Sequence, residues 1–117
     1  MSYFHSMDEM DPKELVPGVH LRTVWGDKVM LSLVDIAADG EVPEHTHPHE
    51  QAGLIMQGAV DFTIGGETRR LHPGDAYVIP GDVPHHVVPV DGPAQALDIF
   101  SPPREEYKGD SVGFRSE

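Results

Sequence analysis

The chain contains no cysteine, so it can form neither a disulfide framework nor a thiolate metal site. It has no apolar run approaching the ~20 residues that a membrane-spanning helix needs. Basic residues are also scarce: 8 Lys and Arg against 20 Asp and Glu give a formal charge of −12. Nucleic acids and anionic membrane surfaces are therefore not expected partners, because few cations can neutralise phosphates. The first twelve residues carry no Lys or Arg, unlike a secretory signal, so we expect a cytoplasmic protein.

Glycine and proline are frequent instead, with 12 and 11 copies spread along the 117 residues. They separate short apolar or alternating runs, which is typical of an all-β sandwich or barrel. A chain of this length is expected to form one domain, over residues 1–117, with a core at about 18–104 and less ordered ends. The expected strands lie at 29–37, 52–57, 59–64, 76–79, 85–90 and 94–100.

Several local signals predict the connections between these strands. Gly65-Gly66 lies between two alternating runs and predicts a two-residue hairpin, because glycine tolerates the positive φ angles of such turns. The segments 72–75 and 91–93 combine Gly, Pro and Asp, and we expect turns there. One helical turn is expected near 11–15.

The histidines provide the first functional signal. His45 and His47 are two residues apart, so on a strand both side chains project to one side. Gln51 shares their parity, whereas Glu50 has the opposite one. A third imidazole would come from His85, brought alongside by strand pairing. We interpret His45, His47, Gln51 and His85 as ligands of one divalent metal ion, with Glu50 in place of Gln51 as the alternative.

Two segments, 40–51 and 74–86, resemble the paired motifs of the cupin superfamily. The first family motif has His-x-His, usually a Glu, and then a Gly; here Gln51 stands at the Glu position. The second has Gly, Pro-x-Gly and His; here Asp82 stands at the second Gly position. The matching residues are His45, His47, Gly58, Gly74, Pro80 and His85. The resemblance implies a double-stranded β-helix, or jelly-roll barrel, commonly dimeric and with a metal in its mouth.

The expected donor set favours a particular kind of chemistry. Three imidazoles and an amide oxygen are all neutral, so the metal ion would keep its full double charge. That favours Lewis-acid work or the binding of an anionic, oxygen-rich substrate. These donors suit Ni, Zn, Fe or Mn, so the sequence does not select one metal.

The C-terminal part of the chain provides the second functional signal. Alternation along 96–100 places Asp98 and Phe100 on one face, toward either solvent or the barrel interior. Ser-Pro-Pro at 101–103 then presents Arg104. A guanidinium can bind a carboxylate through two hydrogen bonds, an aromatic ring can pack on a sugar, and a carboxylate can move a proton. We interpret these three side chains as the catalytic group for a sugar acid; the alternative is an ordinary surface Asp–Arg ion pair.

Together with the cupin motifs, this ending resembles the KdgF-like proteins of pectin and alginate breakdown. The resemblance implies that 4,5-unsaturated monouronates, released by lyases, are converted to linear 4-deoxy-5-keto uronates by ring opening and enol-to-ketone tautomerisation. It also implies a homodimer. Two other functions stay open: a metal-dependent cupin dioxygenase and a non-catalytic sugar-acid-binding cupin. The positions that match are His45, His47, Gln51, His85, Asp98, Phe100 and Arg104.

Overall fold

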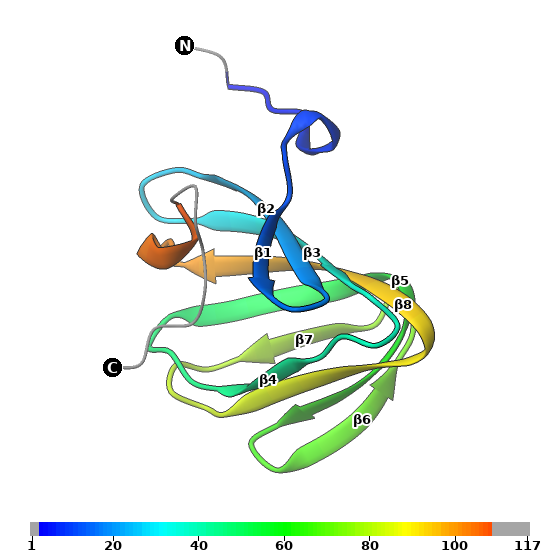
Figure 1. Cartoon of the computed structure of the whole chain (residues 1–117). Coiled ribbons are helices and arrows are strands. Elements are labelled where there is room, and N and C mark those ends of the chain that lie inside the picture. Colours follow the sequence, from blue (N-terminus) through cyan, green and yellow to red (C-terminus); the bar gives the residue numbers. More distant parts are fainter. Residues whose placement is uncertain (1–2, 109–117) are drawn as a thin grey trace.

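The structure, a computed structural model, describes residues 3–108 and consists almost entirely of antiparallel β-strands (Figure 1). Two short 3-10 helices, η1 (Met7–Glu9) and η2 (Glu105–Tyr107), flank the strands. None of the described helices is long and apolar enough to span a membrane. The strands are β1 (Lys13–Val16), β2 (Val19–Trp25), β3 (Met30–Ile36), β4 (Val42–His45), β5 (Glu50–Ile64), β6 (Glu67–Leu71), β7 (Ala76–Ile79) and β8 (His85–Ser101).

Two long strands, β5 and β8, build the barrel because each of them takes part in two layers. β5 pairs with β7 along its first part and with β6 along its last part. β8 pairs with β4 at its start and with β3 along its second half, and β5 and β8 pair with each other throughout. One layer therefore runs β1-β2-β3-β8-β5-β7, and the other runs β4-β8-β5-β6 (Figure 1). This is the single jelly-roll barrel that the sequence predicts.

The middle of β5 differs from the prediction of two strands. The runs 52–57 and 59–64 are joined into one strand, and its register shifts near Gly58. Gly58 has a φ of +74°, and a Cβ there would lie 2.3 Å from the carbonyl oxygen of Pro93. Glycine is required at this position because it alone tolerates both the left-handed backbone and the close approach. The strand bends here without ending.

The middle of β8 departs from the prediction in the same way. We expected a turn at 91–93 between two strands, whereas the structure continues β8 through this segment. Asp91 and Gly92 have φ angles of 59° and 142°, so the backbone kinks locally while strand pairing resumes on both sides. Bends within a strand and turns between strands contain the same residue types. Only the pairing of the flanking segments with neighbouring strands distinguishes the two.

We expect Gly58→Ala to lower the free energy of unfolding by at least about 2 kcal/mol, because it adds left-handed strain to a backbone clash. Urea unfolding of the metal-free protein measures this change. Gly66→Ala is the matched control: Gly66 also has a positive φ, of 88°, but a Cβ there meets nothing within 4 Å. An equal loss in both variants would contradict the role of the Pro93 contact.

The shorter elements give mixed results. The hairpin at Gly65-Gly66 and the turn at 72–75 are confirmed. The helical turn near 11–15 is wrong: β1 begins at Lys13, because this segment pairs with β2, and η1 lies just before it. We did not predict β2, although its alternating side chains are buried on one face.

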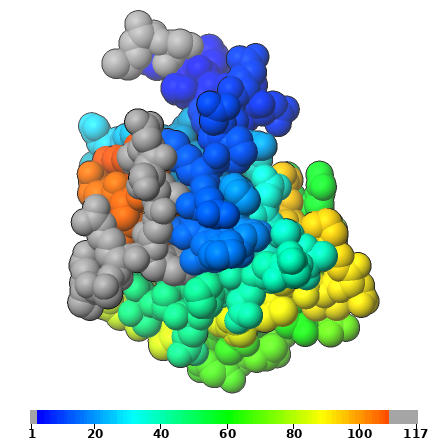
Figure 2. Space-filling view, in the orientation of Figure 1, coloured from blue at the N-terminus to red at the C-terminus, as the bar shows by residue number. Residues whose placement is uncertain are grey.

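The hydrophobic core fills the space between the two layers. Inward-facing residues alternate along β2 and β3, as expected when one face of a sheet packs against another. The segment before β1, which includes η1, lies at one end of the barrel body (Figure 2). The largest fully buried hydrophobic side chains are Leu21, Met30, Ile55, Ile79, Val19 and Val60.

Candidate functional site

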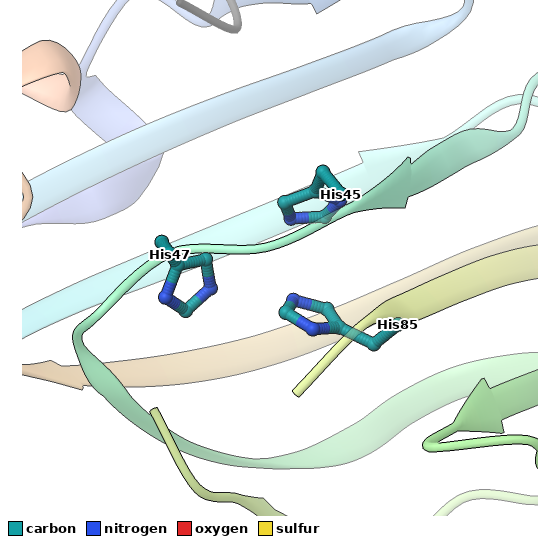
Figure 3. A group of neighbouring side chains, drawn as sticks. All are labelled: His45, His47 and His85. Carbon is teal, nitrogen blue, oxygen red and sulfur yellow. The ribbon is translucent and has the colours of Figure 1, made fainter. Parts of the chain in front are cut away.

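Three histidines converge at one end of the barrel (Figure 3). His45 ends β4 and pairs with His85, the first residue of β8, while His47 lies in the loop that follows β4. One ring nitrogen of each residue lies within 4.8 Å of the others. The ring centroids of His45 and His85 are 4.3 Å apart, and those of His47 and His85 are 4.9 Å apart. This spacing allows all three imidazoles to contact one ion.

The backbone fixes the tautomer of each ring. Each Nδ1 lies beside a backbone carbonyl two residues away, at 2.8 Å for His45, 3.1 Å for His47 and 2.9 Å for His85. A carbonyl oxygen only accepts hydrogen bonds, so Nδ1 carries the proton in all three rings. With the proton on Nδ1, Nε2 is the nitrogen of each ring that carries a lone pair and can ligate a metal.

The same rings stay neutral at ordinary pH. Burial lowers the pKa of His45 and of His47 to about 4, because the charged form loses its hydration. The positive charge of nearby Arg104 contributes to both of these shifts in pKa. Burial also lowers the pKa of His85. Protons therefore compete weakly for the Nε2 lone pairs at pH 7.

Gln51 supplies an oxygen to the same point. Its side chain is buried, and its Oε1 lies 3.0 Å from Nε2 of His47. Its amide N–H is turned the other way, since the Asp98 carboxylate accepts a hydrogen bond from Gln51. An oxygen and a nitrogen lone pair thus face each other, which is unfavourable unless a cation lies between them. Nε2 of His85 is likewise buried and has no hydrogen-bond partner among the described residues.

These residues therefore fit a divalent transition-metal ion held by three imidazoles and one amide oxygen. Glu50, the alternative fourth ligand, is exposed and lies on the opposite face of β5 from Gln51. Its carboxylate does not share the side of the strand that faces the histidines.

A partly open cavity lies beside the histidines inside the barrel. Apolar side chains from both layers form most of its walls, a composition that is typical of small-molecule sites. The chemistry-bearing side chains around it are His45, Gln51, His85, Asp98, Phe100 and Arg104. The structure thus brings the two sequence signals, which lie far apart along the chain, to one cavity.

Asp98 faces the cavity from β8 and not the solvent. The Tyr77 hydroxyl donates a hydrogen bond to its Oδ1 at 2.5 Å. Burial raises the pKa of Asp98 from 3.8 to about 6, although the hydrogen bonds from Tyr77 and Gln51 oppose that rise. A carboxyl group in this environment can exchange a proton near neutral pH.

Arg104 follows β8 and is almost completely buried, with 3% of its surface exposed. It donates hydrogen bonds to the hydroxyl of Tyr107 at 2.9 Å and to the carboxylate of Glu106 at 3.3 Å. Its guanidinium also lies 4.2 Å from the Tyr107 ring centroid. The alternative of a surface ion pair with Asp98 is wrong, because η2 packs over Arg104 and supplies both partners. Its Nε is buried and has no partner among the described residues.

Phe100 stands between the two polar groups of the cavity. Its ring lies 5.6 Å from that of His47 and 5.7 Å from that of Tyr107, and its side chain is buried. The guanidinium of Arg104 is 5.4 Å from its centroid. Phe100 therefore forms an apolar wall between the histidines and Arg104.

Two tyrosines of the cavity were missed by sequence reasoning. Tyr77 shares the parity of Ile79 within the second cupin-like motif, and that signal could have placed it on an inward face. Tyr107 offered no such signal, because it lies beyond the last strand in a stretch that we expected to be loosely held. It is in fact 3% exposed, and its carbonyl accepts a hydrogen bond from the Thr23 hydroxyl.

The fold and the site define a cupin. Residues 32–100 match the family model described as "Cupin domain", and the chain therefore belongs to the cupin superfamily. The match covers both histidine segments and most of the barrel.

Within that superfamily the chain is KdgF-like. It is 31% identical to the pectin degradation protein KdgF of Dickeya dadantii, over 86% of this chain and 93% of that protein. The solved structure of KdgF from a Halomonas species superposes with a TM-score of 0.85 at 30% identity, covering 92% of this chain and 99% of that one. A Bacillus subtilis protein named H2HPP isomerase is 31% identical over 79% of this chain, which spans 40% of its length. These relatives place the chain among cupin enzymes.

Proposed function

We propose that this protein converts 4,5-unsaturated monouronates into linear 4-deoxy-5-keto uronates. The observation that supports this most strongly is the single cavity lined by metal-binding imidazoles, the Asp98 carboxyl and the buried Arg104 guanidinium. The similarity to KdgF proteins over nearly the whole chain supports the same substrate class. One sugar ring with one carboxylate matches a cavity that has apolar walls and one buried cation.

The cavity offers a binding group for each part of such a substrate. Arg104 has N–H groups beyond the two that Tyr107 and Glu106 use, including the buried Nε, and these suit the substrate carboxylate. Phe100 supplies an apolar surface against which the sugar ring can pack. Because the walls are apolar, they exclude water and strengthen each polar contact in the cavity.

The reaction is an isomerisation and needs no external oxidant or reductant. Loss of the proton from the anomeric hydroxyl forms the C1 carbonyl, breaks the bond between C1 and the ring oxygen and leaves an enolate whose oxygen is on C5. Protonation at C4 then turns the enolate into the C5 ketone. Asp98 carries the proton, either from the anomeric hydroxyl or to C4. A divalent metal held by the three histidines and Gln51 would supply Lewis-acid stabilisation of negative charge on a substrate oxygen.

The test uses unsaturated monouronate prepared freshly with a pectin lyase or an alginate lyase. Loss of the alkene signal is followed by NMR with metal-loaded protein, with chelated protein and without protein. We expect acceleration that chelation removes. A metal-loaded protein that accelerates neither substrate would contradict the proposal, and oxygen consumption during turnover would instead indicate a dioxygenase. Saturable binding of the sugar acid without turnover would indicate a binding protein.

The same resemblance supports two further properties. We propose a homodimer, which light scattering after gel filtration measures directly. We also propose a cytoplasmic location, where imported or released monouronates would be consumed. Comparing rates on pectin-derived and alginate-derived monomers tests which polysaccharide supplies the substrate.

We expect Arg104→Lys to raise KM by about tenfold or more with a smaller change in kcat. Lysine keeps the positive charge but cannot form the bidentate hydrogen bonds that a guanidinium makes with the substrate carboxylate. Steady-state rates over a range of substrate concentrations separate the two constants. Arg70→Lys is the matched control, since Arg70 makes a similar pair with Asp61 on the exposed surface. An unchanged KM in Arg104→Lys would contradict the binding role.

A further inference from the structure

Tyr77, Gly53 and Asp98 form one row across three adjacent strands of the barrel wall. Gly53 of β5 pairs with Tyr77 of β7 on one side and with Asp98 of β8 on the other. Residues directly opposite each other in antiparallel strands project to the same face. Both Tyr77 and Asp98 line the cavity, so this row faces inward. Their backbones are nevertheless two strand spacings apart, roughly 9.5 Å.

Gly53 lets the two side chains meet over that distance. A Cβ at this position would lie 2.6 Å from Oδ1 of Asp98 and 2.6 Å from the hydroxyl of Tyr77. Gly53 is not among the glycines with a positive φ, so the strand does not require glycine for its conformation. The space that a side chain at Gly53 would occupy is left open, and across it the Tyr77 hydroxyl donates its hydrogen bond to Asp98 at 2.5 Å.

The Asp98 carboxylate, held by Tyr77, in turn orients the side chain of Gln51. Its carboxylate accepts a hydrogen bond from the Gln51 side chain, which must come from the amide N–H. The amide oxygen is thereby turned toward His47, 3.0 Å from its Nε2. A hydrogen bond from Tyr77 on one carboxylate oxygen and contact with Gln51 restrict how the carboxylate can rotate.

We propose that Tyr77 is a positioning residue, whose hydroxyl reaches through the gap at Gly53, holds the Asp98 carboxylate and thereby turns the Gln51 oxygen toward the histidines. The expected effect of Tyr77 on proton transfer by Asp98 rests on the proposed function. Its expected effect on metal binding through Gln51 does not, because metal affinity can be measured without substrate.

The surroundings of Tyr77 make it possible to remove the hydroxyl by itself. The Tyr77 ring packs against Phe62, with centroids 4.5 Å apart, so Tyr77→Phe keeps the apolar contact. Ser32 provides a matched control on the other side of Asp98. It pairs with Asp98 across β3 and β8 and is fully buried, yet its hydroxyl has no hydrogen-bond partner among the described residues. Ser32→Ala therefore removes a buried hydroxyl from a residue paired with Asp98, where that hydroxyl makes no hydrogen bond to the carboxylate.

The first experiment compares both variants in steady-state turnover of unsaturated monouronate. We expect Tyr77→Phe to lower kcat by about tenfold, the usual scale for a hydrogen bond to a charged group, and to leave KM within twofold. Ser32→Ala should retain the kcat and KM of the unaltered protein. Unchanged kcat in Tyr77→Phe, or an equal loss in Ser32→Ala, would overturn the proposal.

A double-mutant cycle separates positioning from a general effect on the core. If Tyr77 acts through Asp98, then Tyr77→Phe has less than a twofold further effect on kcat when Asp98→Asn is already present. A structural role would instead give the same tenfold loss in both backgrounds and would overturn the proposal. Circular dichroism of each variant shows that the comparison is made between folded proteins.

The second experiment uses Co²⁺ as a probe and needs no turnover. Visible absorption of Co²⁺ reports its ligand set, and titration gives its dissociation constant. We expect Tyr77→Phe to shift the absorption bands and to weaken Co²⁺ binding by about tenfold, the lower end of the range seen when an outer partner of a ligand is removed. Ser32→Ala should match the unaltered protein. If the metal-loaded unaltered protein does not turn over substrate, the proposed function fails. A normal Co²⁺ spectrum and affinity in Tyr77→Phe would separately overturn the positioning role.

Discussion

Asp98→Asn is expected to lower kcat by at least about a hundredfold, because it removes the carboxyl that carries the proton while keeping the size of the side chain. A divalent metal should remain bound at one ion per chain, since the three histidines keep their Nε2 lone pairs and their contacts with backbone carbonyls. Turnover of unsaturated monouronate and metal analysis of the same sample check both parts. The result would separate the proton-transfer group from the metal ligands.

Asp61→Asn is the control for this prediction. Asp61 also lies on a long strand and forms a hydrogen bond, but with Arg70 on the exposed surface. Its replacement should leave kcat and metal content unchanged. If Asp98→Asn retained full turnover, Asp98 would not be the proton carrier. If it lost the metal together with activity, Asp98 would act mainly by supporting the metal site.

His47→Ala is expected to remove metal and activity together. Partners that merely orient a metal ligand change affinity by about 10- to 100-fold, so the loss of a ligand should exceed that range. Ion binding also stabilises the folded state in proportion to its affinity. Added Ni²⁺ or Zn²⁺ should therefore raise the Tm of the unaltered protein and have little effect on the Tm of His47→Ala. Thermal unfolding with and without the ion measures the difference.

His86→Ala provides the matched histidine control. His86 is adjacent to His85 in the sequence, but its Nε2 pairs with the Glu41 carboxylate at 2.7 Å instead of facing the other imidazoles. Metal binding, the Tm shift and turnover should all persist in this variant. Full activity in chelated protein, or in His47→Ala without a bound ion, would contradict a metal-dependent reaction.

The candidate site was visible in the sequence to the extent that its residues follow strand parity. Asp98 and Phe100 share a parity on β8 and both line the cavity. His47 instead lies in the loop after β4, so its approach to His45 and His85 was not set by alternation along a strand. Parity works on β8 because side chains alternate along a strand whatever its neighbours are. It could not choose between solvent and interior for Asp98, since either side satisfies the alternation. That choice depended on the layer β4-β8-β5-β6, whose residues line the same cavity as Asp98.

Other features needed contacts between distant segments. Gly53 looks like any glycine in a strand until Tyr77 and Asp98 are placed on either side of it by pairing with β7 and β8. The burial of Arg104 depends on η2, which carries two of its partners and continues past the last strand. No pattern in the sequence marks such contacts, because they are set by how strands pair and not by their composition.

The sequence by itself determined the β-rich class and the residues that we propose bear the chemistry, because alternation, turn residues and histidine spacing are local properties. The resemblance to cupins implied the single barrel. Tertiary structure alone decided that β5 and β8 run unbroken through Gly58 and Asp91, that Asp98 faces the cavity, and that Tyr77 reaches it across Gly53. These outcomes depend on register and packing between segments far apart in the chain. Whether Gly58 and Asp91 lie in a bend or a turn, and whether Asp98 lies at the surface or in the interior, depends on how the neighbouring strands pair and pack.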